Sequence, residues 1–123
     1  MSQIPNSKRN NYDLEERTFN FAKRVNEYVN KLPRTISNIE NGKQLVRAAG
    51  SVGANYIEAN ESLSKKDFVL RIKISRKEAK ETIYWVRIIL AVNGPDFTDE
   101  CRDLLNEATE LKKILSAILN KSS

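Results

Sequence analysis

Apolar residues recur at steps of three and four residues along four separate segments of this chain, and this spacing is the strongest constraint on its fold. Such a recurrence gathers apolar side chains on one side of an α-helix. The first helix is predicted between Asp13, which would cap it, and the Leu32-Pro33 pair that ends it. Its apolar line consists of Leu14, Thr18, Phe21, Ala22, Val25, Tyr28, Val29 and Leu32.

The second and third helices have recognisable ends. The second is predicted from near residue 39 to residue 60. Ser64, with Asp67 three residues later, resembles a capping box and begins a third helix over 64–92, which the Asn93-Gly94-Pro95 run stops. The second helix has two neighbouring lines rich in small residues: Val46, Gly50, Gly53 and Ile57 on one, and Leu45, Ala49, Val52, Tyr56 and Ala59 on the other.

The fourth helix is predicted from Asp96 or Thr98 to about Asn120. Asp99 and Glu100 fall in its first turn, where the helix dipole favours acidic side chains. Its core line is Cys101, Leu104, Leu105, Ala108, Leu111, Leu115 and Ile118.

Four helices joined by short loops predict an all-α fold, an up-down-up-down antiparallel four-helix bundle. The length of 123 residues suits one core and one domain. We expect a flexible N-terminal arm over residues 1–12, a single bundle domain over 13–120 and a loose tail over 121–123.

The chain contains no histidine and one cysteine, Cys101. Without imidazole, Ser-His-Asp and Cys-His catalysis and His-ligated metal sites are excluded, and we expect no catalytic residue, metal or cofactor. Chemistry that uses carboxylates alone or lysine stays open. Cys101 lies on the apolar face of the last helix and is predicted to be a buried structural thiol.

No apolar stretch approaches the roughly 18 residues that a membrane span needs, and the first residues lack the apolar core of a secretory signal. We therefore expect a cytoplasmic protein that does not contact a membrane.

The second helix contains two glycines, Gly50 and Gly53, among small residues. Each costs roughly 1 kcal/mol relative to alanine inside a helix, so we expect a neighbouring helix to approach closely there. Asn55 and Glu58 follow one turn apart. We interpret them as a structural polar set that fixes the contact with neighbouring helices, with Glu58 paired to a basic residue. A small polar ligand site is the alternative.

The third helix has more than one apolar stripe. Its core stripe is Phe68, Ile72, Ser75, Ala79, Ile83, Val86 and Leu90, and a second stripe lies roughly opposite. A monomeric bundle needs one stripe per helix, so the second predicts a subunit interface. The alternative is that other parts of the same chain cover it. The second stripe consists of Leu70, Ile74, Trp85 and Ile88.

Between these stripes lies a basic face. Clustered cations on one helix indicate contact with the phosphate backbone of RNA or DNA. Two alternatives stay open: a solvated face, in which Lys77 pairs with Glu81, and a protein-interaction scaffold whose basic face binds an acidic protein. The predicted nucleic-acid contacts are Lys66, Lys73, Arg76, Lys77, Lys80 and Arg87.

Three runs of residues stand out: Gln44 to Ala59, Ser64 to Phe68 and Glu78 to Trp85. They resemble those of a known family, the bacterial 23S rRNA intervening-sequence proteins, also called four helix bundle proteins. The similarity extends from about Leu14 to about Leu119. The chain departs from the family's pattern at two places. The usual Asn-Ile-x-Glu-Gly is Asn55-Tyr56-Ile57-Glu58-Ala59 here, and Lys77 stands near Ser75 where a small residue is expected.

This resemblance implies a four-helix bundle that assembles as a ring of five subunits. Some bacteria encode such proteins within insertions in the large ribosomal RNA gene. The family is also similar to the accessory variability determinant protein of diversity-generating retroelements, a basic pentamer that works with a reverse transcriptase and binds nucleic acid. The expected partners are therefore further copies of the chain, RNA or DNA, and a reverse transcriptase.

Overall fold

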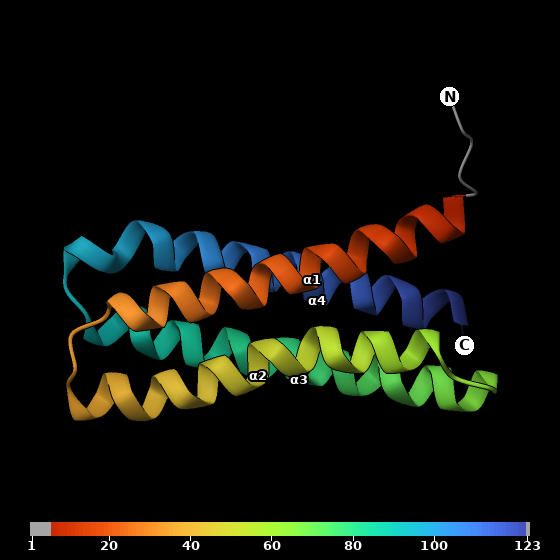
Figure 1. The fold of residues 1–123 in the computed structure, drawn as a ribbon, viewed down its shortest axis with the longest axis horizontal. Coiled ribbons are helices and arrows are strands. Elements are labelled where there is room, and N and C mark those ends of the chain that lie inside the picture. Colours follow the sequence, from red (N-terminus) through yellow and green to blue (C-terminus); the bar gives the residue numbers. More distant parts are fainter. Residues whose placement is uncertain (1–5, 123) are drawn as a thin grey trace.

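Four long helices lie side by side in the computed structural model, which describes residues 6–122 and the side chains of residues 14–122 (Figure 1). The α1–α2 and α3–α4 connections lie at one end of the bundle, and the α2–α3 connection lies at the other (Figure 1). The predicted up-down-up-down four-helix bundle is confirmed. The elements are α1 (Asn6–Lys31), α2 (Ile36–Asn60), α3 (Lys65–Val92), the short 3-10 helix η1 (Pro95–Phe97) and α4 (Thr98–Ser122).

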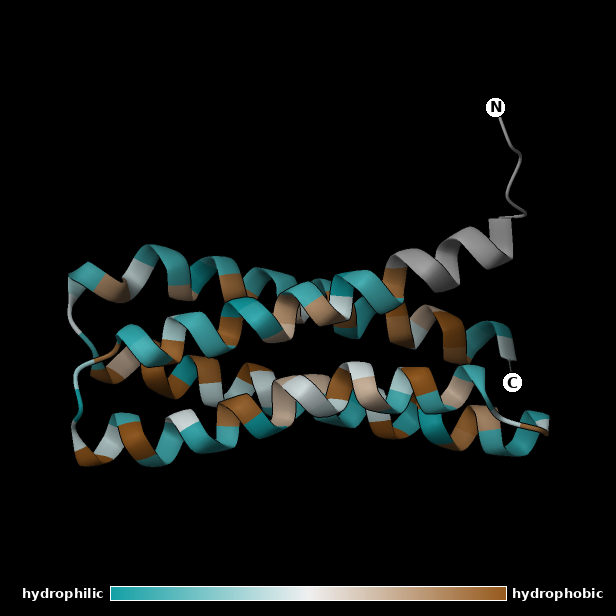
Figure 2. Ribbon diagram, viewed as in Figure 1, coloured by the Kyte–Doolittle hydropathy of each residue, from teal (hydrophilic) through white to brown (hydrophobic). Residues whose placement is uncertain are grey.

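One hydrophobic core runs along the bundle, and hydrophobic bands alternate with hydrophilic ones along every helix (Figure 2). The most extensive contacts join α2 to α3 and α3 to α4, while α1 packs against α2 and α4. Five of the largest fully buried side chains are Tyr28, Tyr56, Phe21, Leu45 and Ile72. Because all four helices contribute to this core, the face of α3 turned away from it is fixed by packing.

Two helices begin at side-chain caps. The Ser64 hydroxyl accepts a hydrogen bond from the backbone N–H of Asp67 at 3.1 Å, so the predicted cap of α3 is confirmed. The Thr35 hydroxyl likewise accepts from the N–H of Asn38 at 3.1 Å. This cap starts α2 at Ile36, three residues before the predicted start.

The outer ends of α1 and α4 differ from the predictions. Helix α1 begins at Asn6, so Asp13 lies inside the helix and does not cap it. No proline or glycine follows Pro5 until well into the bundle, so nothing in the sequence stops the helix from extending. Helix α4 continues to Ser122, and the predicted loose tail is wrong for residues 121–122. The first five residues of the predicted arm, and Ser123, lie outside the described residues.

The two glycines of the predicted close approach behave differently. A Cβ built at Gly53 would lie 2.8 Å from the hydroxyl oxygen of Thr18 on α1, so close approach is confirmed there. A Cβ at Gly50 would meet nothing within 4 Å, and the prediction is wrong for that position within this chain. Gly42 is a second close contact, because its Cβ would lie 2.8 Å from Val29. One face of α2 therefore packs against α1 at two glycines that lie about three turns apart.

Candidate nucleic-acid interface

Four of the predicted basic residues follow a line along α3, at Lys66, Lys73, Lys80 and Arg87. Steps of seven residues return to nearly the same side of a helix, and the line extends about 31 Å at a rise of 1.5 Å per residue. All four side chains are exposed. Helix α3 therefore presents a basic edge along most of its length.

The structure brings four predicted residues, Lys73, Arg76, Lys77 and Lys80, into the lining of one hollow between α3 and α4. The rest of the lining is Lys112 and Ser116 from α4, and the volume is about 330 Å³. We call this the basic hollow. No carboxylate of residues 14–122 lines it. Lys66 lies outside it, and Arg87 lines the hollow next to it.

Sequence reasoning missed Lys112. Its neighbour Lys113 is equally basic but is paired with Glu110 at 3.7 Å. Helical spacing within α4 says which residues are exposed, but it does not say which of them lie opposite the basic edge of α3. Only the packing of α3 on α4 identifies Lys112 as part of the site.

The cations of the basic hollow lack ion pairs within the described part of the chain. The Lys77–Glu81 pair that the spacing allows does not form. Several cations elsewhere are matched: Arg17 contacts Glu107 at 2.7 Å and Lys31 contacts Glu100 at 2.6 Å. Like charges that converge without counter-charges raise the local positive potential, and this favours an anionic ligand.

A second hollow adjoins the basic one and shares Lys80 and Lys112 with it. Its volume is about 530 Å³, and we call it the aromatic hollow. Tyr84 is 57% exposed, and its ring lies 5.2 Å from that of Trp85 at an interplanar angle of 73°, an edge-to-face contact. The full lining is Lys80, Glu81, Ile83, Tyr84, Trp85, Arg87 and Lys112.

Part of the second apolar stripe of α3, the predicted oligomer interface, is buried within the bundle of the same chain. Trp85 is half-buried and packs against the core of its own bundle, while Ile74 and Ile88 are half-buried. Leu70 is 54% exposed. The stripe therefore keeps apolar surface at the outside of α3, centred on Leu70.

The two residues of the predicted polar set, Asn55 and Glu58, differ in whether they contact a neighbouring helix. Asn55 joins α2 to α3, because its side-chain oxygen accepts a hydrogen bond from the Arg71 guanidinium at 3.3 Å while its amide donates to the Ser51 carbonyl. Glu58 is exposed, and the expected pair with a basic residue is not found within residues 14–122. The wheel position of Glu58 faces solvent, so burial does not force it to find a partner.

A carboxylate that is enclosed by its surroundings is Glu78 on α3. Its side chain is 12% exposed and lies 3.5 Å from the Arg47 guanidinium. Its Oε1 atom is buried without a hydrogen-bond partner among the described residues. Burial raises the pKa of Glu78, the side chain of Glu81 raises it further, and Arg47 and Lys77 lower it less. Glu78 is thus a poor counter-ion for the basic hollow.

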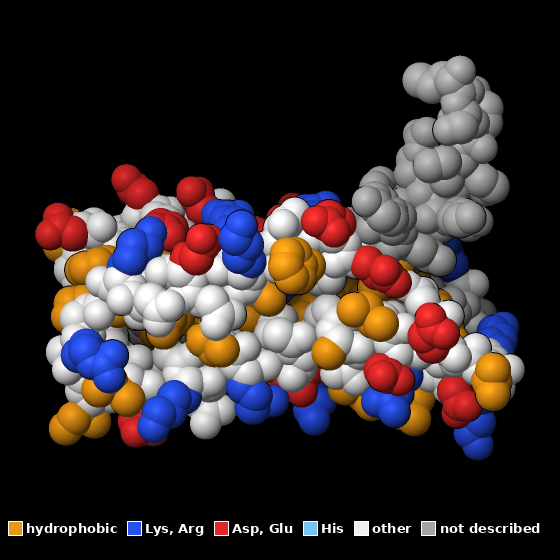
Figure 3. All heavy atoms as spheres, in the orientation of Figure 1, with side chains coloured by type: hydrophobic (Ala, Val, Ile, Leu, Met, Phe, Trp, Pro, Cys, Tyr) orange, Lys and Arg blue, Asp and Glu red, His pale blue; other side chains and the backbone are white. Residues whose placement is uncertain are grey.

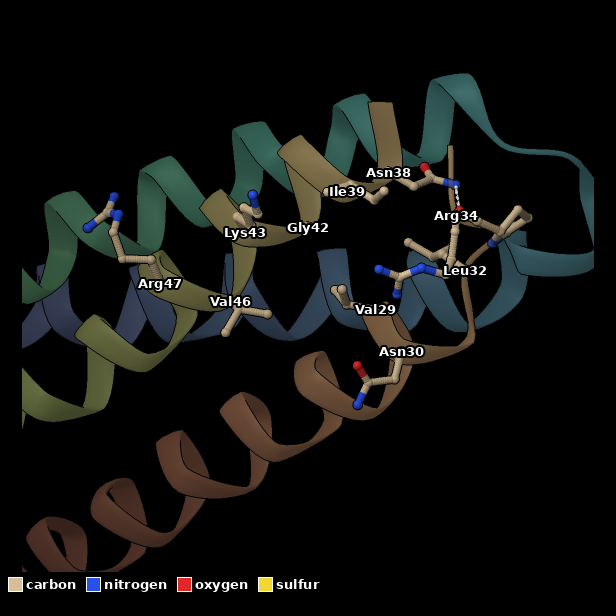
Figure 4. Close-up of a pocket in the computed structure, with 11 residues that line it drawn as sticks. Val29, Asn30, Leu32, Arg34, Asn38, Ile39, Gly42, Lys43, Val46 and Arg47 are labelled. Carbon is tan, nitrogen blue, oxygen red and sulfur yellow. Dashed lines mark hydrogen bonds between the residues drawn. The ribbon is translucent and has the colours of Figure 1, made fainter. Parts of the chain in front are cut away.

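A third hollow, of about 430 Å³, lies between α1 and α2 (Figure 4). Val29 and Val46 form part of its apolar floor, and Arg34 extends from the connecting loop. Two of its cations are already matched: Lys43 contacts Glu40 at 3.7 Å, and Arg47 contacts Glu78. Across the face formed by α1 and α2, basic and acidic side chains are interspersed (Figure 3). This cleft is therefore a weaker anion site than the basic hollow.

The remaining predictions concern the thiol, metals and membranes. Cys101 is 1% exposed, so the predicted buried thiol is confirmed. Over the described residues, no group of three or more acidic or cysteine side chains could hold a metal ion. None of the described helices contains a stretch long and apolar enough to cross a bilayer.

Comparison with known proteins places the chain in context. The family model described as 23S rRNA-intervening sequence protein matches residues 10–117. Among solved structures, the chain is similar to a protein of unknown function from the S23 ribosomal protein family of Bacteroides thetaiotaomicron. The two are 29% identical with a TM-score of 0.72, and the alignment covers 86% of this chain and 97% of that one. No curated protein matches.

Proposed function

Since the chain belongs to the 23S rRNA-intervening sequence protein family, we propose that it is a non-enzymatic homo-oligomer that binds the phosphate backbone of RNA or DNA at the basic hollow. Binding through phosphates alone carries no base specificity, which agrees with the absence of any recognition-helix motif in the sequence. The pentameric subunit number is what the family resemblance implies.

One observation carries the proposal: five cations from two helices converge on a hollow that contains no carboxylate and no ion pair among the described residues. A protein that neutralises phosphates with lysine and arginine releases condensed counter-ions, and this release drives binding. Ser116, at the same hollow, adds a hydroxyl that can donate to a phosphate oxygen. The five cations are Lys73, Arg76, Lys77, Lys80 and Lys112.

Oligomerisation is supported by the apolar surface that remains around Leu70. In a closed ring every subunit presents the same hollow, so one nucleic-acid strand can contact several of them. Repetition of a modest site in this way increases the overall affinity without new contacts.

The nucleic-acid proposal is tested with a triple variant in which Lys77, Lys80 and Lys112 become glutamine. The matched control replaces Lys23, Lys43 and Lys113, which are exposed and lie outside the basic hollow, so that both proteins lose three charges. Affinity for a structured RNA and a DNA duplex is measured over a salt series. Each lost phosphate contact reduces the slope of log affinity against log salt by about 0.7 to 0.9.

For the variant of Lys77, Lys80 and Lys112, the slope of log affinity against log salt concentration is expected to be smaller than that of the wild type by roughly 2 to 3, because three phosphate contacts are removed. The control is expected to keep a slope close to that of the wild type. Equal slopes for the two variants would contradict the site. No salt-dependent binding by the wild type would contradict the function, and an acidic protein partner would then explain the basic hollow.

The oligomer is tested by light scattering. Leu70→Glu introduces a charge into the proposed subunit contact and is expected to lower the solution mass. Leu63→Glu is the control, because Leu63 is fully exposed in the loop between α2 and α3 and lies outside the stripe. A wild-type protein with the mass of one chain would contradict the proposed oligomer.

A further inference from the structure

We propose that the aromatic hollow accepts an unpaired nucleobase, so that this surface binds single-stranded nucleic acid more tightly than duplex. This inference rests on the proposed function, because it presumes that phosphates bind in the basic hollow. It specifies in addition that the ligand is single-stranded and that one of its bases makes a second contact with the protein.

The first support is the exposed ring of Tyr84. More than half of this side chain is open to solvent, although it lies beside Trp85 and Ile83 in the same hollow. The edge-to-face contact with Trp85 limits how the tyrosine ring can move. An aromatic ring held beside a basic groove is how non-specific single-strand binders stack bases.

The second support is the join between the two hollows. Lys80 and Lys112 line both of them, so a phosphate bound between these lysines lies at the entrance to the aromatic hollow. The base attached to the adjoining sugar can then enter while its phosphate stays in the basic hollow. The volume of about 530 Å³ is within the 300–1,000 Å³ typical of small-ligand pockets.

The third support is the distribution of charge. Glu81 lines the aromatic hollow, whereas none of the described carboxylates lines the basic hollow. A carboxylate repels a phosphate but accepts a hydrogen bond from an N–H group of an unpaired base, such as N3–H of thymine. Phosphate is therefore favoured in one hollow and a base in the other.

Duplex nucleic acid cannot use the aromatic hollow without cost. Its bases are paired and stacked, and turning one out takes a few kcal/mol. A single strand offers unstacked bases that aromatic side chains can reach. Both forms can satisfy the basic hollow, so the preference for a single strand comes from the base contact alone.

The test uses the single tryptophan, Trp85, as a reporter. The full-length protein is titrated with oligodeoxythymidine and, separately, with a DNA duplex of equal length, at one salt concentration. We expect oligodeoxythymidine to quench the tryptophan fluorescence and the duplex to leave it nearly unchanged, because a base stacks beside the ring pair only when it is unpaired.

Variants of Tyr84 identify the contact. Tyr84→Ala is expected to weaken binding of oligodeoxythymidine by about 5- to 150-fold per stacked base, with duplex affinity unchanged. Tyr84→Phe keeps the ring and is expected to restore single-strand affinity. Circular dichroism and light scattering of each variant establish that helix content and solution mass are retained.

Three outcomes overturn the inference while leaving the proposed function in place. The first is equal binding of single strand and duplex without quenching, and the second is a Tyr84→Ala variant that binds the single strand like the wild type. The third is a fall in solution mass for Tyr84→Ala, which would assign Tyr84 to a subunit contact. Binding of neither nucleic acid at low salt would instead contradict the proposed function itself.

Discussion

The side-chain amides of Asn38 and Asn93 form a reciprocal pair, in which each Nδ2 donates to the other's Oδ1 at 2.8 Å. Asn38 lies in the first turn of α2 and is 4% exposed, and Asn93 ends α3. Each amide also donates to a backbone carbonyl, that of Pro33 for Asn38 and that of Ile89 for Asn93. The pair therefore ties together the two connections at the same end of the bundle (Figure 1).

Asn38→Ala and Asn93→Ala are each expected to destabilise the fold by about 1 to 3 kcal/mol, because each leaves the other amide enclosed and partly unsatisfied. The double variant should lose less than the sum, with a coupling of about 0.5 to 3 kcal/mol. Urea unfolding measures both quantities. Asn26→Ala is the control, since Asn26 is exposed and bonds to its own helix at the Ala22 carbonyl. Additive losses would mean that the two amides do not act together.

Alanine at the two helical glycines should have opposite effects. Gly53→Ala forces a methyl group against Thr18, within 2.8 Å of Oγ1 and 3.1 Å of Cβ, so α1 must move away and stability falls. Gly50→Ala meets nothing and should stabilise the helix by roughly 1 kcal/mol. Thermal unfolding compares the two. A loss of stability for Gly50→Ala would indicate that another copy of the chain contacts α2 at this point.

Glu78 should make stability depend on pH. Burial and the neighbouring Glu81 raise the folded-state pKa of Glu78 above the ordinary value of 4.5, so the folded state binds this proton more tightly than the unfolded state does. The stability that protonated Glu78 contributes is complete below the unfolded pKa and is lost as pH rises through the folded pKa. Glu78→Gln should therefore gain stability relative to wild type as pH rises above about 4.5 and then level off.

Arg47→Gln tests the same prediction from the other side of the ion pair, because it keeps Glu78 and removes the cation beside it. Arg47 lowers the pKa of Glu78, so its removal should raise that pKa further and extend the loss of stability to higher pH. Urea unfolding over a pH series measures both variants. Parallel curves for wild type and Glu78→Gln would show that Glu78 titrates alike in the folded and unfolded states.

Cys101 should be inert in the folded protein. Its side chain is buried, its Sγ lies 3.6 Å from the Val86 carbonyl oxygen as a hydrogen-bond donor, and burial raises the pKa of the thiol. Because the thiolate is the reactive form, a disulfide reagent should label Cys101 only after unfolding in urea. Ser37→Cys places a second thiol on the exposed side of α2 and should be labelled at once. Immediate labelling of wild-type protein would contradict the packing around α4.

The sequence alone predicts the helices and several of their ends, for local reasons. Each of these helix ends is set by residues nearby in the chain. Ser64 caps the start of α3, Pro33 ends α1, and the Asn93-Gly94-Pro95 run ends α3. The predicted start of α1 is wrong because Asp13 can cap a helix but can also lie inside one, and no proline or glycine over residues 6–13 prevents the helix from extending. Periodicity likewise identified Ile72 and Val86 as core residues.

The fold class, the helix faces and the basic edge of α3 therefore follow from the order of the amino acids, because each depends on residues adjacent in the chain or one or two turns apart. Which faces meet follows only from the packing of the four helices. It placed Lys112 beside Lys80, Asn38 beside Asn93 and Thr18 against Gly53 while leaving Gly50 open. These contacts depend on how rigid helices pack in three dimensions, which the spacing of residues within one helix does not encode.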